Sequence, residues 1–537
     1  MLDKKQAMHF TGIGGAGMSG LAEIMHQLGL AVRGSDLRLT NVTERLEKLG
    51  IQVLQGHAAA NLQPGLNALV ITSAVDENNP ELVEARRRGL PVLLRGELLA
   101  ELMRTRRGVA VAGSHGKTTT STMVATICLA AGLDPTVVIG GSVPALDGAN
   151  AKLGASDLLV CESDESDGSF LWLMPRFAAI TNIDREHLDH YGSYEGVLAA
   201  FVAFSNRVSW EGSLAVCIDD AGVAGILPKV RRRIVTYGRS PDARMRILRP
   251  REATSGISFE LELDGRSLGG FDLPVLGEHN ILNATAAITL SLELGIDVET
   301  IRSALAAFRG PGRRMERKGE EAGVRVIDDY GHHPSEIRAT LKALRPAAAP
   351  GRLYVIFQPH RYTRTRALID EFATSFQDAQ VLRIVDLYAA SEQPIEGVSA
   401  QSLVARIRAA GHPDVEYAGS VAAAAAAAVQ ELCAGDIVLT LGAGNITQAA
   451  DLILRGLREG RGDGETQIAG TCFRPRSYGA GDPAATRALE GRGEGLRLDV
   501  RVHARPAGHG LGELAGRIVP QTGPALHRGP AHHRRQR

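Results

Sequence analysis

Residues 111–120 read Val-Ala-Gly-Ser-His-Gly-Lys-Thr-Thr-Thr and have the pattern of a phosphate-binding loop. The apolar strand expected at Val109–Ala112 runs into a glycine-bearing turn, and a helix is expected over Thr119–Ala131. The backbone N–H groups of such a turn point at one spot, at the positive end of the helix dipole. Lys117 adds a positive charge for the outer phosphates, and the hydroxyl of Thr118 is a hard oxygen suited to Mg²⁺.

The loop departs from the full phosphate-loop pattern at one position, because Val111 stands where that pattern has its first glycine. The shorter form Gly113-Ser-His-Gly-Lys-Thr also fits an ordinary glycine-rich β–α turn. The prediction of a nucleotide site therefore depends on the other motifs of the chain.

Length and composition describe a multidomain protein with no excess charge of either sign. At 537 residues the chain is too long for one core. Its 60 Lys and Arg equal its 60 Asp and Glu, which gives no support for a nucleic-acid partner. Five scattered cysteines without a C-x-x-C pair favour a reducing cytoplasm. No apolar run approaches the roughly 20 residues of a membrane helix, and the N-terminus does not resemble a signal peptide. We expect a cytoplasmic protein with no membrane partner, as a monomer or homodimer.

Short apolar strands alternate with amphipathic helices, which predicts an α/β fold of three domains. We place a Rossmann-like domain at 1–105, a P-loop ATPase-like domain with a mostly parallel sheet at 106–311, and a second Rossmann-like domain at 312–459. Phe308–Arg313 contains glycines and a proline and is typical of a hinge. Residues 460–537 are crowded with Arg, Gly, Ala, Pro and His, and predict a disordered tail.

The periodicity of apolar residues also predicts single elements. Strands are expected at His9–Ile13, Ser213–Cys217 and Leu353–Phe357, and a helix at Asn283–Leu294. Ile257–Leu263 alternates apolar and polar residues and predicts a strand with one buried face.

A second glycine motif, Gly12-Ile-Gly-Gly-Ala-Gly17, follows the first strand and opens a helix. It satisfies G-x-G-x-x-G, and Asp36 lies at the end of the next strand, where a ribose contact is expected. The physical prediction is a diphosphate seat at a helix N-terminus, whichever nucleoside it carries. A purely structural glycine turn is the alternative.

Acidic and histidine side chains follow two strands of the expected central domain. Cys161-Glu-Ser-Asp-Glu-Ser-Asp167 crowds carboxylates at the end of a strand, which favours a nearby cation over a solvated acidic loop. His187 stands beside further carboxylates and is either a metal ligand or a structural histidine.

Three later motifs carry polar side chains at the starts of helices or the ends of strands. Gly277-Glu-His279-Asn280-Ile-Leu-Asn283 could read a base edge or only cap its helix. Asp328–Glu336 reads Asp-Asp-Tyr-Gly-His-His-Pro-Ser-Glu. Arg361 and Arg364 are spaced by three, as in a fork for a carboxylate or phosphate, although a solvated basic face has the same spacing.

Taken together and in this order, the motifs resemble those of the Mur ligases over residues 8 to about 458. The matching stretches are G-S-H-G-K-T-T-T from 113, E-S-D-E-S-D-G-S-F from 162, G-E-H-N-I-L-N-A from 277, D-D-Y-G-H-H-P from 328 and P-H-R-Y-T-R-T-R from 359. The resemblance implies an enzyme that joins L-alanine to the lactyl carboxylate of UDP-N-acetylmuramate with ATP. The carboxylate would attack the γ-phosphate to give an acyl phosphate, which the amine of alanine then attacks.

The resemblance also implies a role for each matching residue. The ATP seat would comprise Gly113, Ser114, His115, Gly116, Lys117, Thr118, Thr119, His279, Asn280, Asn283 and Asp328 or Asp329. Metal ligands would be Thr118, Glu162 and His187, with Mg²⁺ as the ion. The catalytic set would be Lys117, His187, Arg313 or Arg314, His332, Arg361 and Arg364. The nucleotide sugar would meet Gly12, Gly14, Gly15, Ala16, Gly17, Asp36, His57 and Ser73, while Tyr330, His332, Arg361 and Arg364 would bind at the alanine end.

Three other functions fit parts of the same sequence. A sister ligase that attaches a recycled murein peptide to UDP-N-acetylmuramate shares the fold and the ATP seat. An NAD-dependent oxidoreductase accounts for Gly12–Gly17 and Asp36, but it leaves the Gly-Lys-Thr loop unexplained. A non-catalytic nucleotide-binding regulator would keep the loop and lose turnover.

Overall fold

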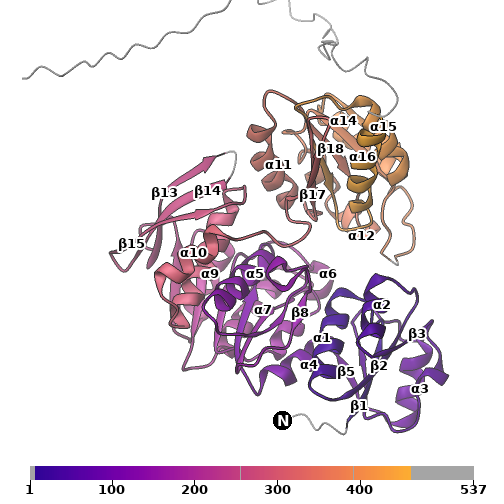
Figure 1. Cartoon of the computed structure of the whole chain (residues 1–537), viewed down its shortest axis with the longest axis vertical. Helices are drawn as coiled ribbons and strands as arrows, with labels where there is room; N and C mark the ends of the chain where they lie inside the picture. Colours follow the sequence, from indigo (N-terminus) through magenta and orange to yellow (C-terminus); the bar gives the residue numbers. More distant parts are fainter. Residues whose placement is uncertain (1–5, 254–255, 391, 461–537) are drawn as a thin grey trace, which may run out of the picture. The chain divides into compact units, whose positions relative to one another are not determined.

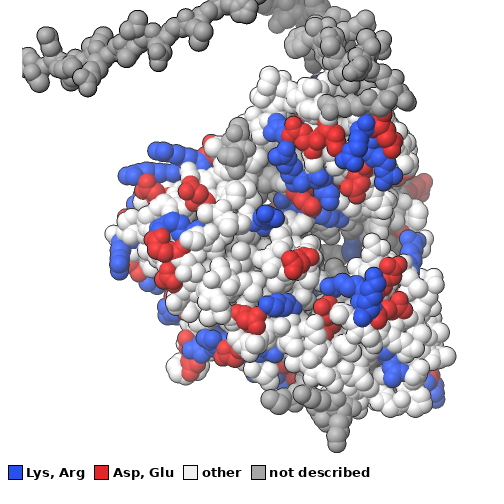
Figure 2. All heavy atoms as spheres, in the orientation of Figure 1, with Lys and Arg blue, Asp and Glu red and all other residues white. Residues whose placement is uncertain are grey.

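The computed structural model describes residues 6–253, 256–390 and 392–460, and the tail predicted at 460–537 lies almost wholly outside the described residues. It contains three separate β-sheets, each flanked by helices, which follow one another along the chain (Figure 1). We call them the N-terminal, central and third lobes. No helix of the described residues is long and apolar enough to cross a membrane. Basic and acidic side chains are interspersed on the face drawn in Figure 2.

The N-terminal lobe is a five-stranded parallel sheet with the order β3-β2-β1-β4-β5. Its strands are β1 (Ala7–Thr11), β2 (Ala31–Asp36), β3 (Gln52–Gln55), β4 (Ala68–Ile71) and β5 (Val92–Leu94). Its helices are α1 (Ala16–Gln27), α2 (Asn41–Lys48), η1 (Ala59–Asn61), α3 (Pro80–Arg88) and α4 (Arg95–Met103). The chain leaves β1 two residues earlier than predicted because Gly12 takes a positive φ of 74° and turns it toward α1.

The central lobe is a ten-stranded sheet with the order β15-β14-β13-β12-β11-β10-β6-β9-β7-β8. Strands β6, β7 and β9–β13 pair in parallel, whereas β8, β14 and β15 pair antiparallel at the edges. The strands are β6 (Arg107–Ala112), β7 (Thr136–Val138), β8 (Ala151–Lys152), β9 (Leu158–Glu162), β10 (Phe177–Ile180), β11 (Ser213–Cys217), β12 (Ile234–Gly238), β13 (Met245–Ala253), β14 (Gly256–Leu263) and β15 (Arg266–Leu273). The helices are α5 (Lys117–Ala130), η2 (Pro144–Leu146), η3 (Ser169–Trp172), α6 (Leu188–Tyr191), α7 (Tyr194–Arg207), α8 (Ala221–Ile226), η4 (Leu227–Lys229), α9 (His279–Glu293) and α10 (Val298–Ala306).

The third lobe is a six-stranded sheet with the order β16-β17-β21-β18-β19-β20, parallel except for β16. Its strands are β16 (Glu316–Glu321), β17 (Val324–Asp329), β18 (Leu353–Phe357), β19 (Val381–Val385), β20 (Val415–Gly419) and β21 (Ile437–Leu441). Its helices are α11 (Pro334–Ala348), α12 (Tyr362–Ala367), α13 (Ile369–Ala373), α14 (Ala400–Ala409), α15 (Val421–Glu431) and α16 (Thr447–Glu459). Polar groups that follow β17, β18 and β21 meet at one edge, because carboxyl ends of parallel strands lie together.

The predicted α/β architecture with mostly parallel sheets is confirmed, and most predicted strands end within two residues of their observed limits. β14 buries Ile257, Phe259 and Leu261 on one face, as its alternation predicted. The predicted start of α9 was four residues late, because this helix begins at His279 without a side-chain cap that the sequence could reveal.

Candidate active site

The turn between β6 and α5 is the loop that was predicted to bind phosphate. Gly113 and Gly116 adopt φ values of +131° and +82°, which only glycine takes without strain. A Cβ at Gly116 would lie 2.3 Å from Oδ1 of Asn283, the helix-α9 residue that lines the far side of the loop. The loop therefore needs glycine at 116 both for its conformation and for the approach of α9.

We expect Gly116→Ala to raise the KM for ATP at least tenfold and to lower thermal stability. The left-handed conformation costs an alanine about 1–2 kcal/mol, and here the added methyl also collides with Asn283. Gly132→Ala is the matched control, because Gly132 has a φ of +71° and open space around its Cβ. Equal KM changes in the two variants would contradict this account, and ATP-dependent phosphate release measures them.

Lys117, the first residue of α5, is folded back over the loop. Its Nζ donates to the carbonyl oxygens of Gly113 at 2.6 Å and Ser114 at 3.0 Å, and to Glu165 at 2.9 Å. Burial would lower the pKa of Lys117, but the carboxylate of Glu165 raises it above the ordinary value. Burial raises the pKa of Glu165 to about 7, against the opposing effect of Lys117. The lysine is therefore a fixed positive charge beside the expected phosphates.

An oxygen-rich pair lies beside the first turn of α5. Thr118 donates from its Oγ1 to Oε2 of Glu162 at 3.0 Å, and the backbone N–H of Gly140 donates to the same oxygen at 2.9 Å. Glu162 reaches this place because β9 pairs directly with β6. A hydroxyl next to a carboxylate is the hard donor set that Mg²⁺ prefers, so these residues fit that ion.

His187 lies with two carboxylates in a second group. Its Nε2 is 3.5 Å from Glu186 and 3.7 Å from Glu165, and one ligand atom from each residue lies within 4.8 Å of the others. Burial lowers the pKa of His187, which favours the neutral imidazole that a metal needs. The predicted metal ligands thus fall into two groups, Thr118 with Glu162 and His187 with two glutamates. Lys117 connects the groups, because it directly precedes Thr118 and donates a hydrogen bond to Glu165.

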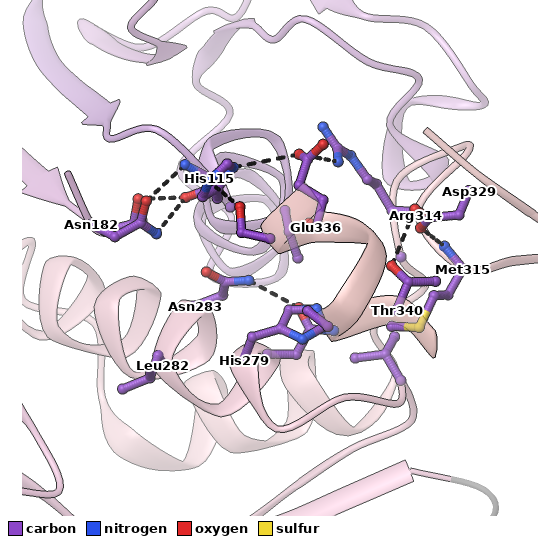
Figure 3. Close-up of a pocket in the computed structure, with 18 of the residues that line it drawn as sticks. His115, Asn182, His279, Leu282, Asn283, Arg314, Met315, Asp329, Glu336 and Thr340 are labelled. Atoms are coloured by element: carbon purple, nitrogen blue, oxygen red, sulfur yellow. Dashed lines mark hydrogen bonds and ion pairs between the residues drawn. The ribbon is translucent and has the colours of Figure 1, made fainter. Parts of the chain in front are cut away.

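A cavity of about 310 Å³ opens beside the loop and takes walls from the central and third lobes (Figure 3). Its central-lobe walls include His115, Gly116, Thr119, Asn182, His279, Asn280 and Asn283, and its third-lobe walls include Arg314, Met315, Asp329, Glu336 and Thr340. Asn283 donates to Oδ1 of Asn280 at 3.0 Å, and Asn280 donates to the carbonyl of Leu276 at 2.7 Å. The size of the cavity, and a largely apolar lining that carries several polar side chains, suit a nucleoside.

The sequence left two alternatives open in the third lobe, Arg313 or Arg314 and Asp328 or Asp329, and their contacts distinguish the members of each pair. Arg314 lines the cavity and contacts Glu336 at 3.3 Å, and Asp329 also lines it. Arg313 instead pairs with buried Asp328 at 3.0 Å and donates to a backbone carbonyl. Arg314 and Asp329 are therefore the members of each pair that line the cavity.

His115 joins the loop to the third lobe. Its Nε2 lies 3.0 Å from Asp184 and 3.0 Å from the hydroxyl of Ser335 at the start of α11. Its Nδ1 lies 3.7 Å from Glu336 (Figure 3). Burial would lower the pKa of His115, but Asp184, Glu336 and Glu186 raise it to about 10. A protonated imidazole thus bridges the lobes at neutral pH.

We expect the contact between these lobes to weaken as pH rises from about 6.5 toward 10. A histidine whose pKa is raised by folding contributes its full stabilisation below its unfolded value of about 6.5, and loses it as pH passes the folded value. Melting temperature should therefore fall more steeply over this range in the parent protein than in His115→Asn. Parallel pH profiles of the two proteins would contradict the bridge.

The predicted alanine-end residues gather beside this contact. Rings of Tyr330 and His332 lie 5.3 Å apart, His332 is 5.9 Å from His360, and His360 stacks on Tyr388 at 5.5 Å. Burial lowers the pKa of His332 to about 4, so its imidazole is neutral. Arg364 points toward His360, with 3.3 Å between Nη1 and Nδ1. Arg361 caps α12 and is exposed.

Comparison with known proteins identifies the family. Residues 7–107 match the Mur ligase family catalytic domain, 111–291 the Mur ligase middle domain, and 313–444 the Mur ligase glutamate ligase domain. The chain is 54% identical to the UDP-N-acetylmuramate–L-alanine ligase of Solibacter usitatus over 463 residues, 86% of this chain and 98% of that protein. The chain belongs to the Mur ligase family.

Further relatives agree with this assignment. The UDP-N-acetylmuramate–L-alanine ligase of a Geobacter species is 48% identical over 85% of this Mur ligase and 99% of its own length. The crystal structure of the UDP-N-acetylmuramate–alanine ligase of Thermotoga maritima matches with a TM-score of 0.72 and 28% identity, over 84% of this chain and 99% of that one. A murein peptide ligase from Psychrobacter arcticus matches in fold with a TM-score of 0.65, over 84% of this chain and 98% of that one.

The predicted nucleotide-sugar contacts of this Mur ligase lie in the N-terminal lobe. The backbone N–H of Gly14 donates to Oδ2 of Asp36 at 2.9 Å, which fixes the glycine turn against the end of β2. His57 contacts Ser35, and Ser73 donates to Asp167 of the central lobe at 3.0 Å. Their roles toward a ligand stay predictions, as do those of the other site residues.

Sequence reasoning missed several carboxylates that hold the site together. Glu165 and Glu186 contact Lys117 and His187, Asp184 contacts His115, and Glu336 contacts Arg314. All of them stand inside motifs that were already quoted or next to them. The signal that could have found them is the excess of positive side chains predicted at the site, since a buried cation needs a partner.

Proposed function

We propose that this chain is an ATP-dependent ligase that joins L-alanine to the lactyl carboxylate of UDP-N-acetylmuramate, in peptidoglycan precursor synthesis. The observation that carries the proposal is the 54% identity with a ligase of that name over 98% of its length. The substrates are ATP and a nucleotide sugar, so we place the enzyme in the cytoplasm. A monomer or homodimer remains the prediction for its assembly.

The first step brings two anions together, since a carboxylate oxygen attacks the γ-phosphorus and ADP leaves. Such a reaction depends on positive charge placed in advance around the transferred group. Lys117 lies at the loop, and Arg314 reaches the same cavity from the third lobe. We assign to Lys117 the outer phosphates and to Arg314 the charge that develops in transfer.

Thr118 and Glu162 fit Mg²⁺ as its ligands, with His187 in the neighbouring group. The ion, when bound, neutralises phosphate charge and so lowers the barrier to attack by the carboxylate. The carboxylate of Glu165 has a different part here, because it fixes Lys117 within reach of the phosphates.

The second step forms the amide. The uncharged amine of L-alanine attacks the acyl carbon, the bond between that carbon and the phosphate oxygen breaks, and inorganic phosphate leaves. Arg361 and Arg364 supply positive charge for the alanine carboxylate, and Tyr330 bounds a small side-chain space. His332 is neutral because burial lowers its pKa to about 4, so it can accept a hydrogen bond near the amine.

The test is phosphate release by the purified full chain with UDP-N-acetylmuramate, ATP and Mg²⁺, offering one amino acid at a time. We expect L-alanine to give the highest kcat/KM, and product mass to show one added alanine. Faster turnover with an L-Ala-D-Glu-diaminopimelate tripeptide would instead identify the recycling ligase. NADH binding with no phosphate release in any mixture would identify the oxidoreductase.

A further inference from the structure

A buried carboxylate lies beneath the predicted nucleotide-sugar seat and has no part in the function proposed above. Glu81 belongs to the first turn of α3, and its side chain is fully buried. Its oxygens accept hydrogen bonds from Thr11 at 2.6 Å, Ser35 at 2.8 Å and Asn61 at 2.6 Å. His9 lies 3.3 Å away and is also buried. Glu81 therefore ties together the ends of β1 and β2 and the segment after β3.

Glu81 is ionised in this position. Burial would raise its pKa, but contacts with His9, Thr11 and Asn61 lower the pKa to about 2. An ionised carboxylate accepts hydrogen bonds and donates none. The contact between Glu81 and Ser35 thus has only one direction, with the single hydroxyl hydrogen of Ser35 pointing to Glu81.

This direction determines the next hydrogen bond. Nδ1 of His57 lies 2.9 Å from the same hydroxyl oxygen of Ser35. Since the hydrogen of Ser35 is already given to Glu81, Ser35 can only accept from His57, and Nδ1 must carry the hydrogen. In a neutral imidazole the other nitrogen, Nε2, is then an acceptor. Nε2 makes no hydrogen bond within the described part of the chain and is not among its buried, unpartnered atoms.

The sheet order places His57 at the nucleoside end of the seat. The strands run β1, β2, β3 toward one edge, with the glycine turn after β1, Asp36 at the end of β2 and His57 two residues after β3. A dinucleotide-type fold lays diphosphate at the first strand and ribose at the second. A base that extends from the ribose toward the same edge of the sheet would lie over the end of the third strand, where Nε2 of His57 makes no hydrogen bond within the described residues.

We propose that Glu81 is a positioning residue that fixes the tautomer of His57, so that Nε2 of His57 accepts a hydrogen from the imide N3–H of the uracil ring. The inference rests on the proposed function, since it takes a UDP-sugar as the ligand. Uracil carries a hydrogen at N3 and cytosine does not, so this relay favours uridine over cytidine nucleotides. Glu81 itself touches no ligand and acts through Ser35 and His57.

The experiment measures binding of UDP-N-acetylmuramate and of its N3-methyluridine analogue to the full chain by calorimetry. We expect the methyl analogue to bind at least 30-fold more weakly to the parent protein. In Glu81→Gln the ratio of the two dissociation constants, methyl analogue to parent ligand, should fall to about threefold. The glutamine amide can donate to Ser35, and the hydroxyl hydrogen of Ser35 is then free to be donated to His57. The 2′- and 3′-deoxyuridine analogues form a second arm. If only these deoxyuridine analogues lost affinity in a way that depends on Glu81, the contact of His57 would be to the ribose and the assignment to the base would be overturned.

Two controls separate this role from a purely structural one. Glu84→Gln changes a half-buried carboxylate of the same helix that pairs with Arg87 and Arg88, and should leave the binding ratio unchanged. Nitrogen-15 NMR of histidine, with His57 assigned by loss of its signal in His57→Asn, should show hydrogen at Nδ1 in the parent protein and at Nε2 in Glu81→Gln. Hydrogen at Nε2 in the parent protein, or the same ratio in the parent and Glu81→Gln, would overturn the proposal.

Failure of this inference is distinguishable from failure of the proposed function. Binding needs no turnover, so a protein that binds UDP-N-acetylmuramate without any dependence on Glu81 refutes only the relay. A folded protein that does not bind the nucleotide sugar at all refutes the function on which the relay rests.

Discussion

Replacing Lys117 with alanine is expected to lower kcat for L-alanine ligation by roughly 10²–10³-fold or more, as for loss of one donor to a developing anion. The lysine ammonium is a fixed positive charge at the loop, and its removal also leaves the buried carboxylate of Glu165 without its 2.9 Å partner. Lys117→Met keeps most of the side-chain volume and should show the same loss, which places the effect on charge. Steady-state phosphate release measures both variants.

The matched control for Lys117 is Lys152→Ala in the same lobe. Lys152 pairs with Asp134 at 2.6 Å, neither residue is among those that line the cavity, and both side chains are partly exposed. Its replacement should leave kcat within a factor of two. A Lys117→Met enzyme that keeps the parent rate would contradict the assignment of this loop as the triphosphate seat.

Glu162→Gln is expected to raise the Mg²⁺ concentration for half-maximal activity by about 10–100-fold, the scale seen when a group that supports a metal is lost. The substitution preserves shape and the hydrogen bond from Thr118 but removes the negative charge beside it. Activity should therefore recover in part at high Mg²⁺. Titration of the phosphate-release rate with Mg²⁺ measures the shift.

Glu211→Gln serves as control for Glu162, because Glu211 is an exposed residue of the same lobe and is 3.7 Å from Arg176. Its Mg²⁺ curve should overlay that of the parent protein. An unchanged Mg²⁺ requirement in Glu162→Gln would exclude Glu162 as a ligand and leave the His187 group as the metal site.

The fold could be predicted from the sequence where local signals were strong. The strands at Ser213–Cys217 and Leu353–Phe357 have the predicted limits, because both are short, fully buried apolar runs. The predicted ends of helices and strands were wrong where a backbone conformation or a distant contact sets them. Helix α5 begins at Lys117 and not at Thr119, since Gly116 with its positive φ is the cap.

The candidate site was less accessible to sequence reasoning, because its pairing is set by tertiary structure. The sequence left Arg313 and Arg314 as alternatives, and only the tertiary contacts show that Arg313 pairs with Asp328 while Arg314 lines the cavity. The bridge from His115 to Ser335 joins residues 220 positions apart and has no local signal. The glycine turns and the Lys–Thr pair, in contrast, could be predicted because the residues that define each of them are neighbours in the sequence.

The most direct test of the central claim follows an oxygen atom. The terminal phosphoryl group of ATP is expected to pass to the lactyl carboxylate before the amide forms. One oxygen of that carboxylate must then leave with the phosphate when the amine attacks. UDP-N-acetylmuramate labelled with ¹⁸O in that carboxylate is turned over with ATP, Mg²⁺ and L-alanine, and the released phosphate is analysed by mass spectrometry. We predict one ¹⁸O in each phosphate from fully labelled substrate. Unlabelled phosphate accompanied by amide product would contradict the claim.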